Sequence, residues 1–137
     1  MANVSAFVNE PVVDFSKPEN AAAMRATLAK IAGELGREYD LVIGGVRHKT
    51  AGTIQSLNPT NPSQTVGIHQ KAGHEQIEPA MQAALKAFAS WRFVSAAERA
   101  AWLFRVADLL RRRKFEFNAW LIYEVGKNWA EAEADTC

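Results

Sequence analysis

The one thiol of the chain belongs to Cys137, the last residue of the sequence. A cysteine nucleophile needs a lowered pKa, an electropositive setting and a neighbouring base or oxyanion donors. The sequence around Cys137 assures none of these, so we expect an inert thiol. A single cysteine also excludes an internal disulfide framework and suits a reducing compartment, which favours a cytoplasmic protein.

Three histidines are the other candidates for metal binding or acid–base chemistry. A zinc site favours ligand pairs spaced i, i+4 on a helix, or a cluster of cysteine and histidine. His48, His69 and His74 have neither arrangement. We therefore expect ordinary surface or hairpin histidines and predict no metal-binding residue.

Two glycine-containing pairs invite comparison with phosphate-binding loops. Gly44-Gly45 and Gly126-Lys127 fit neither G-x-G-x-x-G nor G-x-x-x-x-G-K-[ST]. Without a glycine cradle at the start of a helix there is no self-contained nucleotide site. Both pairs predict turns, and we predict no cofactor-binding residue.

The one run of charge is Arg111-Arg112-Arg113-Lys114, followed by Phe115 and Phe117. Basic residues interleaved with aromatic ones can bind nucleic acid. Cations in the last turn of a helix, however, also complement its negative end. Since 16 basic and 15 acidic residues give a net charge of +1, no overall field attracts a polyanion. We favour a solvated helix end and predict no nucleic-acid partner.

The strongest helical pattern lies in residues 95–133. Ser95 with Glu98 predicts a capping box at the start of one helix. Gly126 predicts a left-handed helix end, and Asn128 with Glu131 predicts the start of a further helix. Apolar side chains recur at helical spacing in two segments between these signals: Trp102, Leu103, Val106, Leu109 and Leu110, then Phe117, Trp120, Leu121 and Val125.

Carboxylates and tryptophans in this region have both functional and structural interpretations. We interpret the glutamates as exposed-face or capping residues rather than an acid–base pair, and predict no catalytic residue. The tryptophans are many for so short a chain, so they are either buried between helices or exposed to a missing partner. The glutamates are Glu116, Glu124, Glu131 and Glu133, and the tryptophans are Trp91, Trp102, Trp120 and Trp129.

The first half of the chain predicts an arm, a helix and a β-rich centre. Residues 1–15 are irregular and suggest an extended arm that packs on another part of the protein. Ser16 to Glu19 suggests a capping box, so we expect a helix over residues 16–36 that ends at Gly36. Residues 39–71 predict antiparallel strands, with a hairpin at Gly44-Gly45 and a loop at residues 58–63.

A helical region is expected over residues 75–137. Pro79 fits only the first turn of a helix, so we expect the first of three or four helices to begin between Glu75 and Glu78. No stretch of about 18 apolar residues could span a bilayer, and we predict no membrane partner. The residues alone therefore predict a single α+β domain.

Four segments in order resemble the aldehyde dehydrogenase superfamily, and within it the N-terminal part of the 1-pyrroline-5-carboxylate dehydrogenases. They are NEPVVDFS, LGREYDLVIGG, SLNPTNPSQTVG and LLRRRKFEFNAWLIYEVGKNWAEAEAD. The resemblance implies an α/β fold for the full-length enzyme. In such an enzyme a cysteine thiolate attacks the aldehyde of L-glutamate γ-semialdehyde, hydride passes to NAD, and a glutamate-activated water releases L-glutamate.

The same resemblance implies that the reactive centre lies elsewhere. In the family, the catalytic cysteine, the general base, the oxyanion-hole asparagine and the nucleotide-binding fold follow the region matched here. We therefore expect residues 1–137 to be one incomplete domain, part of an NAD-binding domain, whose partner is the missing remainder of the enzyme. The full-length enzyme is expected to be a homo-oligomer. We expect the 137-residue chain to be inactive alone. The alternative is a non-enzymatic remnant or a helical interaction module.

Overall fold

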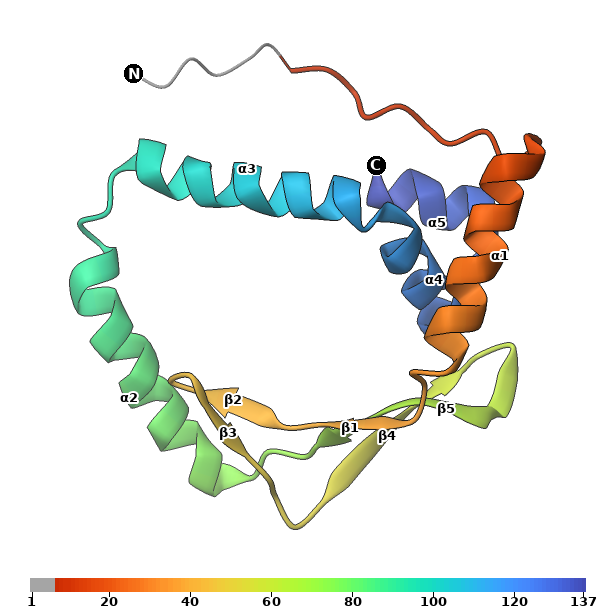
Figure 1. Ribbon diagram of the computed structural model, residues 1–137. Helices are drawn as coiled ribbons and strands as arrows, with labels where there is room; N and C mark the ends of the chain where they lie inside the picture. The colour runs from red at the N-terminus through yellow and green to blue at the C-terminus, as the bar shows by residue number, and fades with distance from the viewer. Residues whose placement is uncertain (1–6) are drawn as a thin grey trace.

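The computed structural model describes residues 7–137, which form an α+β arrangement of five helices and five strands (Figure 1). Four helices follow the β-rich centre, which confirms the predicted order of elements. The elements are α1 (Pro18–Ala32), β1 (Arg37–Tyr39), β2 (Leu41–Ile43), β3 (Val46–His48), β4 (Thr53–Asn58), β5 (Asn61–Gln70), α2 (His74–Trp91), α3 (Ala96–Arg112), α4 (Lys114–Val125) and α5 (Trp129–Thr136).

The main sheet is mixed, in the order β1-β5-β4. β4 and β5 are antiparallel, as expected, but β1 runs parallel to β5, with Arg37 opposite Gly67 and Tyr39 opposite His69. The prediction of a purely antiparallel region beginning at residue 39 was therefore wrong. Two parallel strands are joined by a long crossover connection rather than a tight turn, so the sequence between β1 and β5 carries no turn signal that predicts their pairing.

The predicted hairpin at Gly44-Gly45 is confirmed. β2 and β3 pair antiparallel, and the two glycines have φ of 58° and 84°. Positive φ at both central residues is the geometry that matches the twist of the flanking strands.

The loop expected at residues 58–63 is shorter than predicted. β5 begins at Asn61 and includes Pro62, so only Pro59 and Thr60 form the turn. The side chain of Asn58 closes it, because its Oδ1 accepts hydrogen bonds from the Thr60 N–H at 3.0 Å and the Thr60 hydroxyl at 2.8 Å. A register irregularity next to Leu57 lets the strands continue past the prolines.

Two helix boundaries differ from prediction. The N-cap of α1 is Lys17, which makes no side-chain capping bond, and the Ser16 hydroxyl instead donates to Asp14. The helix ends at Ala32 rather than at Gly36. α2 begins at His74, one residue before the predicted range, and Pro79 lies in its second turn. Proline there leaves the carbonyl of the residue four positions earlier without its helical donor.

The capping signals of the last third are confirmed. Ser95 and Glu98 exchange hydrogen bonds at the start of α3, and Asn128 and Glu131 do so at the start of α5. Gly126 ends α4 with a φ of 76° and donates its N–H to the Ile122 carbonyl at 3.0 Å.

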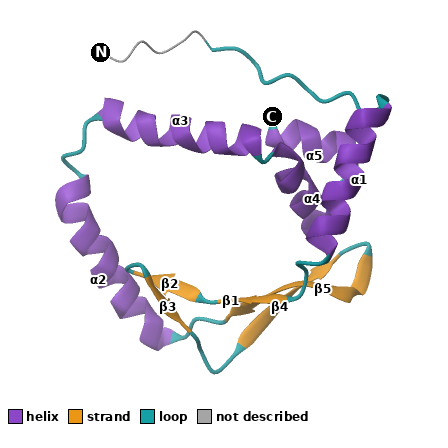
Figure 2. Ribbon diagram, in the orientation of Figure 1, coloured by secondary structure: helices purple, strands orange, loops and turns teal. Residues whose placement is uncertain are grey.

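The core lies where α1 packs on α4, and α4 in turn packs on α5 and β4. Met24, Ile31 and Ala119 are fully buried at its centre. Figure 2 shows this cluster of helices at one end of the sheet; α3 extends away from it, and α2 lies at the other end beside β2 and β3. Neither α2 nor α3 has a buried residue. Partly buried side chains surround the centre: Phe15, Leu28, Leu35, Phe115, Trp120, Ile122, Tyr123 and Trp129.

Substituting Gly126 by alanine is expected to lower the free energy of unfolding by about 2–5 kcal/mol. A left-handed alanine costs about 1–2 kcal/mol, and its Cβ would lie 2.9 Å from the Cγ of Pro59, an overpacking that adds about 1–3 kcal/mol. Gly45→Ala is the matched control, since it has positive φ and no atom within 4 Å of the added Cβ. Chemical denaturation of both variants gives the comparison, and equal losses would contradict a role for the Pro59 contact.

Candidate functional site

A buried ion pair joins the first residue of α4 to α5. The Nζ of Lys114 lies 2.5 Å from Oε1 of Glu133, and the two side chains are 13% and 0% exposed. This corrects two predictions, because Glu133 is not an exposed-face carboxylate and Lys114 is not part of a solvated helix end. α5 folds back on α4, which directs Glu133 toward the start of that helix.

Glu133 has further partners on the arm and on α4. Its Oε1 also accepts the N–H of Val13 at 2.8 Å, and its Oε2 accepts the amide Nδ2 of Asn118 at 2.7 Å. The Oδ1 of Asn118 in turn accepts the hydroxyl of Thr136 at 2.6 Å. The polar atoms of this buried cluster therefore have partners, as buried polar groups require.

The contacts of the pair determine its charge state. Burial raises the pKa of the Glu133 carboxyl, but Lys114, the Val13 N–H and Asn118 together bring that pKa below its ordinary value. Burial lowers the pKa of Lys114, and Glu133 raises it above its ordinary value. Since hydrogen bonds and an opposite charge favour the ionised forms, both groups are charged at neutral pH.

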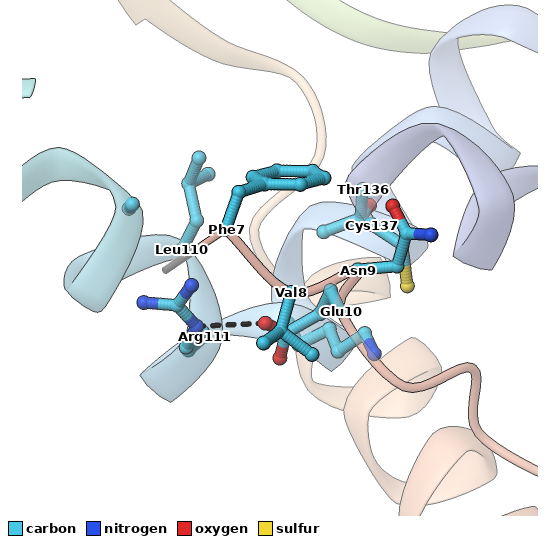
Figure 3. A pocket seen from close by; sticks show the side chains of 10 residues that line it. Phe7, Val8, Asn9, Glu10, Leu110, Arg111, Thr136 and Cys137 are labelled. Carbon is cyan, nitrogen blue, oxygen red and sulfur yellow. Dashed lines mark hydrogen bonds and ion pairs between the residues drawn. The ribbon is translucent and has the colours of Figure 1, made fainter. Parts of the chain in front are cut away.

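The arm expected over residues 1–15 is described from Phe7 onward, and it lies against this cluster. Glu10 pairs with Nε of Arg111 at 2.7 Å (Figure 3), and the Pro11 carbonyl accepts the Lys114 ammonium at 2.8 Å. Phe15 packs edge-on against Trp129, with ring centroids 5.3 Å apart. Residues 10–15 therefore cross the ends of α3, α4 and α5.

A cavity of about 160 Å³ lies between the arm and α3 and α5. Phe7, Val8, Leu110, Thr136 and Cys137 are among its lining residues (Figure 3). The exposed Sγ of Cys137 lies 3.4 Å from Glu133 Oε1, so it approaches a carboxylate already used by other donors.

The histidines do not come together. His48 lies in β3, His69 stacks on Tyr39 with centroids 5.2 Å apart, and His74 opens α2. Within residues 7–137, no group of three histidine, cysteine or acidic side chains could hold a metal ion.

The rest of the basic run serves the junction of α3 and α4. Arg111 and Arg112 lie in the last turn of α3, as predicted, and Arg111 also pairs with Asp108 at 3.0 Å. Arg113 stands between the helices and forms an ion pair with Glu116.

The second candidate site is a surface that we call the α2–α3 face. The apolar side chains Ile77, Met81, Leu85 and Phe88 of α2 are about half exposed, and Trp102 of α3 is 55% exposed. Within residues 7–137 no helix is long and apolar enough to cross a bilayer. Trp120 and Trp129 pack on the core, whereas Trp91 and Trp102 do not. The α2–α3 face comprises Ile77, Met81, Leu85, Phe88, Trp91, Trp102, Leu103 and Val106.

Comparison with known proteins identifies the architecture. Residues 46–137 match the model of the aldehyde dehydrogenase family. The chain belongs to the aldehyde dehydrogenase family. This aldehyde dehydrogenase region is similar to the 1-pyrroline-5-carboxylate dehydrogenase of Geobacillus kaustophilus, with 48% identity over 133 residues that cover 97% of this chain and 26% of that protein. The resemblance seen in the sequence is confirmed.

Solved aldehyde dehydrogenases share the fold. A 1-pyrroline-5-carboxylate dehydrogenase from Thermus with bound NAD matches with a TM-score of 0.92 and 46% identity, covering 98% of this chain and 26% of that one. The Mycobacterium tuberculosis enzyme matches with a TM-score of 0.87 and 29% identity, covering 99% and 26%. The present chain therefore spans about a quarter of the length of the relatives that it matches.

Proposed function

We propose that this chain is the N-terminal part of an NAD-dependent 1-pyrroline-5-carboxylate dehydrogenase. Such an enzyme oxidises L-glutamate γ-semialdehyde to L-glutamate in proline catabolism, in the cytoplasm. The observation that carries the proposal is identity of 44–48% across 95–97% of the chain to several relatives that all bear this enzyme name. We assign residues 1–137 to one incomplete domain that supplies the arm, the β-rich centre and the outer helices of the NAD-binding domain.

We propose that the described residues do not form an NAD site by themselves. Gly44 and Gly45 form a hairpin turn, and Gly126 ends a helix. None of these three glycines lies at the start of a helix, where phosphate binds. We therefore place NAD binding and the reactive cysteine in the part of the enzyme beyond the matched quarter. On this proposal the 137-residue chain is inactive alone.

The α2–α3 face supports a structural role within a larger enzyme. α2 and α3 are amphipathic, yet their apolar stripes remain without a partner among the described residues. Soluble proteins rarely leave large apolar helix stripes of this kind uncovered. We propose that the remainder of the polypeptide packs on this face, and that the complete enzyme forms a homo-oligomer.

A second candidate function is a non-enzymatic interaction module. The exposure of Trp91 and Trp102 is the observation that favours it, because tryptophan is a common anchor at protein interfaces. In that case the α2–α3 face would bind a separate protein.

A chimera separates the two candidates. Residues 1–137 are placed in the Geobacillus kaustophilus enzyme in exchange for the matching quarter, and NADH formation from 1-pyrroline-5-carboxylate is measured. We expect the chimera to be active and the isolated chain to produce no NADH. Turnover by the isolated chain, or a folded chimera without activity, would overturn the proposed function, and the second of these outcomes favours the interaction module.

A further inference from the structure

The arm is held through its backbone as well as through its side chains. Lys114 and Glu133 both bind backbone groups of the arm, at Pro11 and Val13. We propose that these two residues, with Arg111 and the ring pair Phe115 and Trp129, form a dock for an extended peptide segment. The occupant of this dock is the chain's own residues 10–15, so the arm is an intramolecular ligand.

The dock recognises one edge of an extended backbone. In an extended chain the C=O of residue 11 and the N–H of residue 13 point to the same side. Lys114 supplies a donor to the first at 2.8 Å, and Glu133 supplies an acceptor to the second at 2.8 Å. The ion pair thus acts as a neighbouring strand would, with one donor and one acceptor. Pro11 is tolerated because the dock uses its carbonyl and needs no N–H from it.

Side chains at both ends of the segment add selectivity. At one end, the carboxylate of Glu10 meets the Arg111 guanidinium at 2.7 Å. At the other, the ring of Phe15 lies 5.3 Å from Trp129 and 6.2 Å from Phe115, between centroids. Val12 is 68% exposed and faces away from this set of contacts. The dock therefore selects a carboxylate and an aromatic ring five positions apart.

The energetics of buried ion pairs support a binding role. Replacing such a pair by apolar side chains of similar size is often neutral or stabilising, so stability alone does not account for Lys114 and Glu133. Each member of the pair makes one hydrogen bond to the backbone of the arm, and Glu133 also accepts from Asn118 and Cys137. The pair therefore ties the arm to α5 and to the junction of α3 and α4. This role is independent of the proposed enzymatic function.

Proline substitution on the arm tests the dock without altering it. Val13→Pro removes the N–H that Glu133 accepts, and Val12→Pro is the matched control at an exposed neighbour. Backbone order of amides 8–15 is measured by 15N NMR relaxation in the full 137-residue chain, because the Val13 N–H is the one amide of this segment with a hydrogen bond among the described residues and the substitution removes it. One lost hydrogen bond to a charged group corresponds to about a tenfold change or more in the docking equilibrium, so we expect the undocked population to rise by about tenfold or more, with loss of backbone order, in Val13→Pro alone.

Amide exchange of the core helix α1 serves as the folding control. Slow exchange across α1 must persist in both variants, which shows that the chain is folded. Equal backbone order of the arm in Val13→Pro and Val12→Pro would overturn the dock.

A charge swap tests whether recognition of the backbone, and not merely charge pairing, holds the arm. Lys114→Glu with Glu133→Lys keeps opposite charges but places a donor opposite the Val13 N–H and an acceptor opposite the Pro11 carbonyl. We expect the arm amides to lose backbone order in this double variant. Backbone order equal to that of the unmodified chain would show that Lys114 and Glu133 act only as an ion pair, and would overturn the proposal.

Discussion

Replacing Lys114 by methionine is expected to lower the free energy of unfolding by about 3–5 kcal/mol, because it leaves the Glu133 carboxylate buried without its counter-charge. Glu133 is fully buried, so water cannot replace the lost ammonium without opening the packing of α5 on α4. The Pro11 carbonyl would lose its donor in the same variant. Denaturant titration followed by tryptophan fluorescence measures the effect.

An exposed ion pair provides the control. Lys127 pairs with Asp135 on the same two-helix unit, but their side chains are 26% and 48% exposed. Lys127→Met is therefore expected to cost less than about 1 kcal/mol. A double variant, Lys114→Met with Glu133→Gln, should be more stable than Lys114→Met alone because no charge remains buried unpaired. Similar losses from Lys114→Met and Lys127→Met would show that the buried pair does not contribute as inferred.

The burial of Glu133 could not be predicted from the residues near it in the sequence. The capping signals at Ser95, Gly126 and Asn128 each involve residues within four positions of one another, and all three are confirmed. Glu133 instead meets Val13 across 120 residues. Ala132, which is fully buried beside Glu133, was a local hint of burial.

The sheet shows the same division between local and distant information. The hairpin at Gly44-Gly45 depends on two residues with positive φ, and its prediction is confirmed. The parallel pairing of Arg37–Tyr39 with β5 depends on a segment about thirty positions away, and a three-residue strand has too short a pattern to predict. Asn58 shortened the adjoining loop through side-chain bonds that composition does not reveal.

The packing of the described residues supports the proposal that this chain is part of a larger enzyme. The chain has one well-packed centre around Met24 and Ile31, and two long helices whose apolar sides have no cover among the described residues. Helices of this kind acquire most of their stability from tertiary packing. The α2–α3 face is therefore where the proposed enzyme would gain stability from its remaining part.

Trp102→Asp is expected to raise the amide exchange of α3 in the chimera by about 100-fold or more. If the remainder of the enzyme packs on the α2–α3 face, the substitution buries an unpaired carboxylate in place of a large ring. A docking loss of about 3 kcal/mol or more corresponds to at least about 100-fold in the equilibrium between docked and undocked helix. In the isolated chain, where Trp102 is 55% exposed, the same substitution should change α3 exchange little.

Ala97→Asp supplies the matched control for the charge itself. Ala97 is exposed in the first turn of α3, and five residues place it about 140° around the helix from Trp102. An aspartate there complements the positive end of the helix, so the chimera should keep both its α3 protection and its activity. If Trp102→Asp leaves α3 protected in the active chimera, the remainder of the enzyme does not cover this face. The exposed tryptophans would then indicate a partner outside the polypeptide.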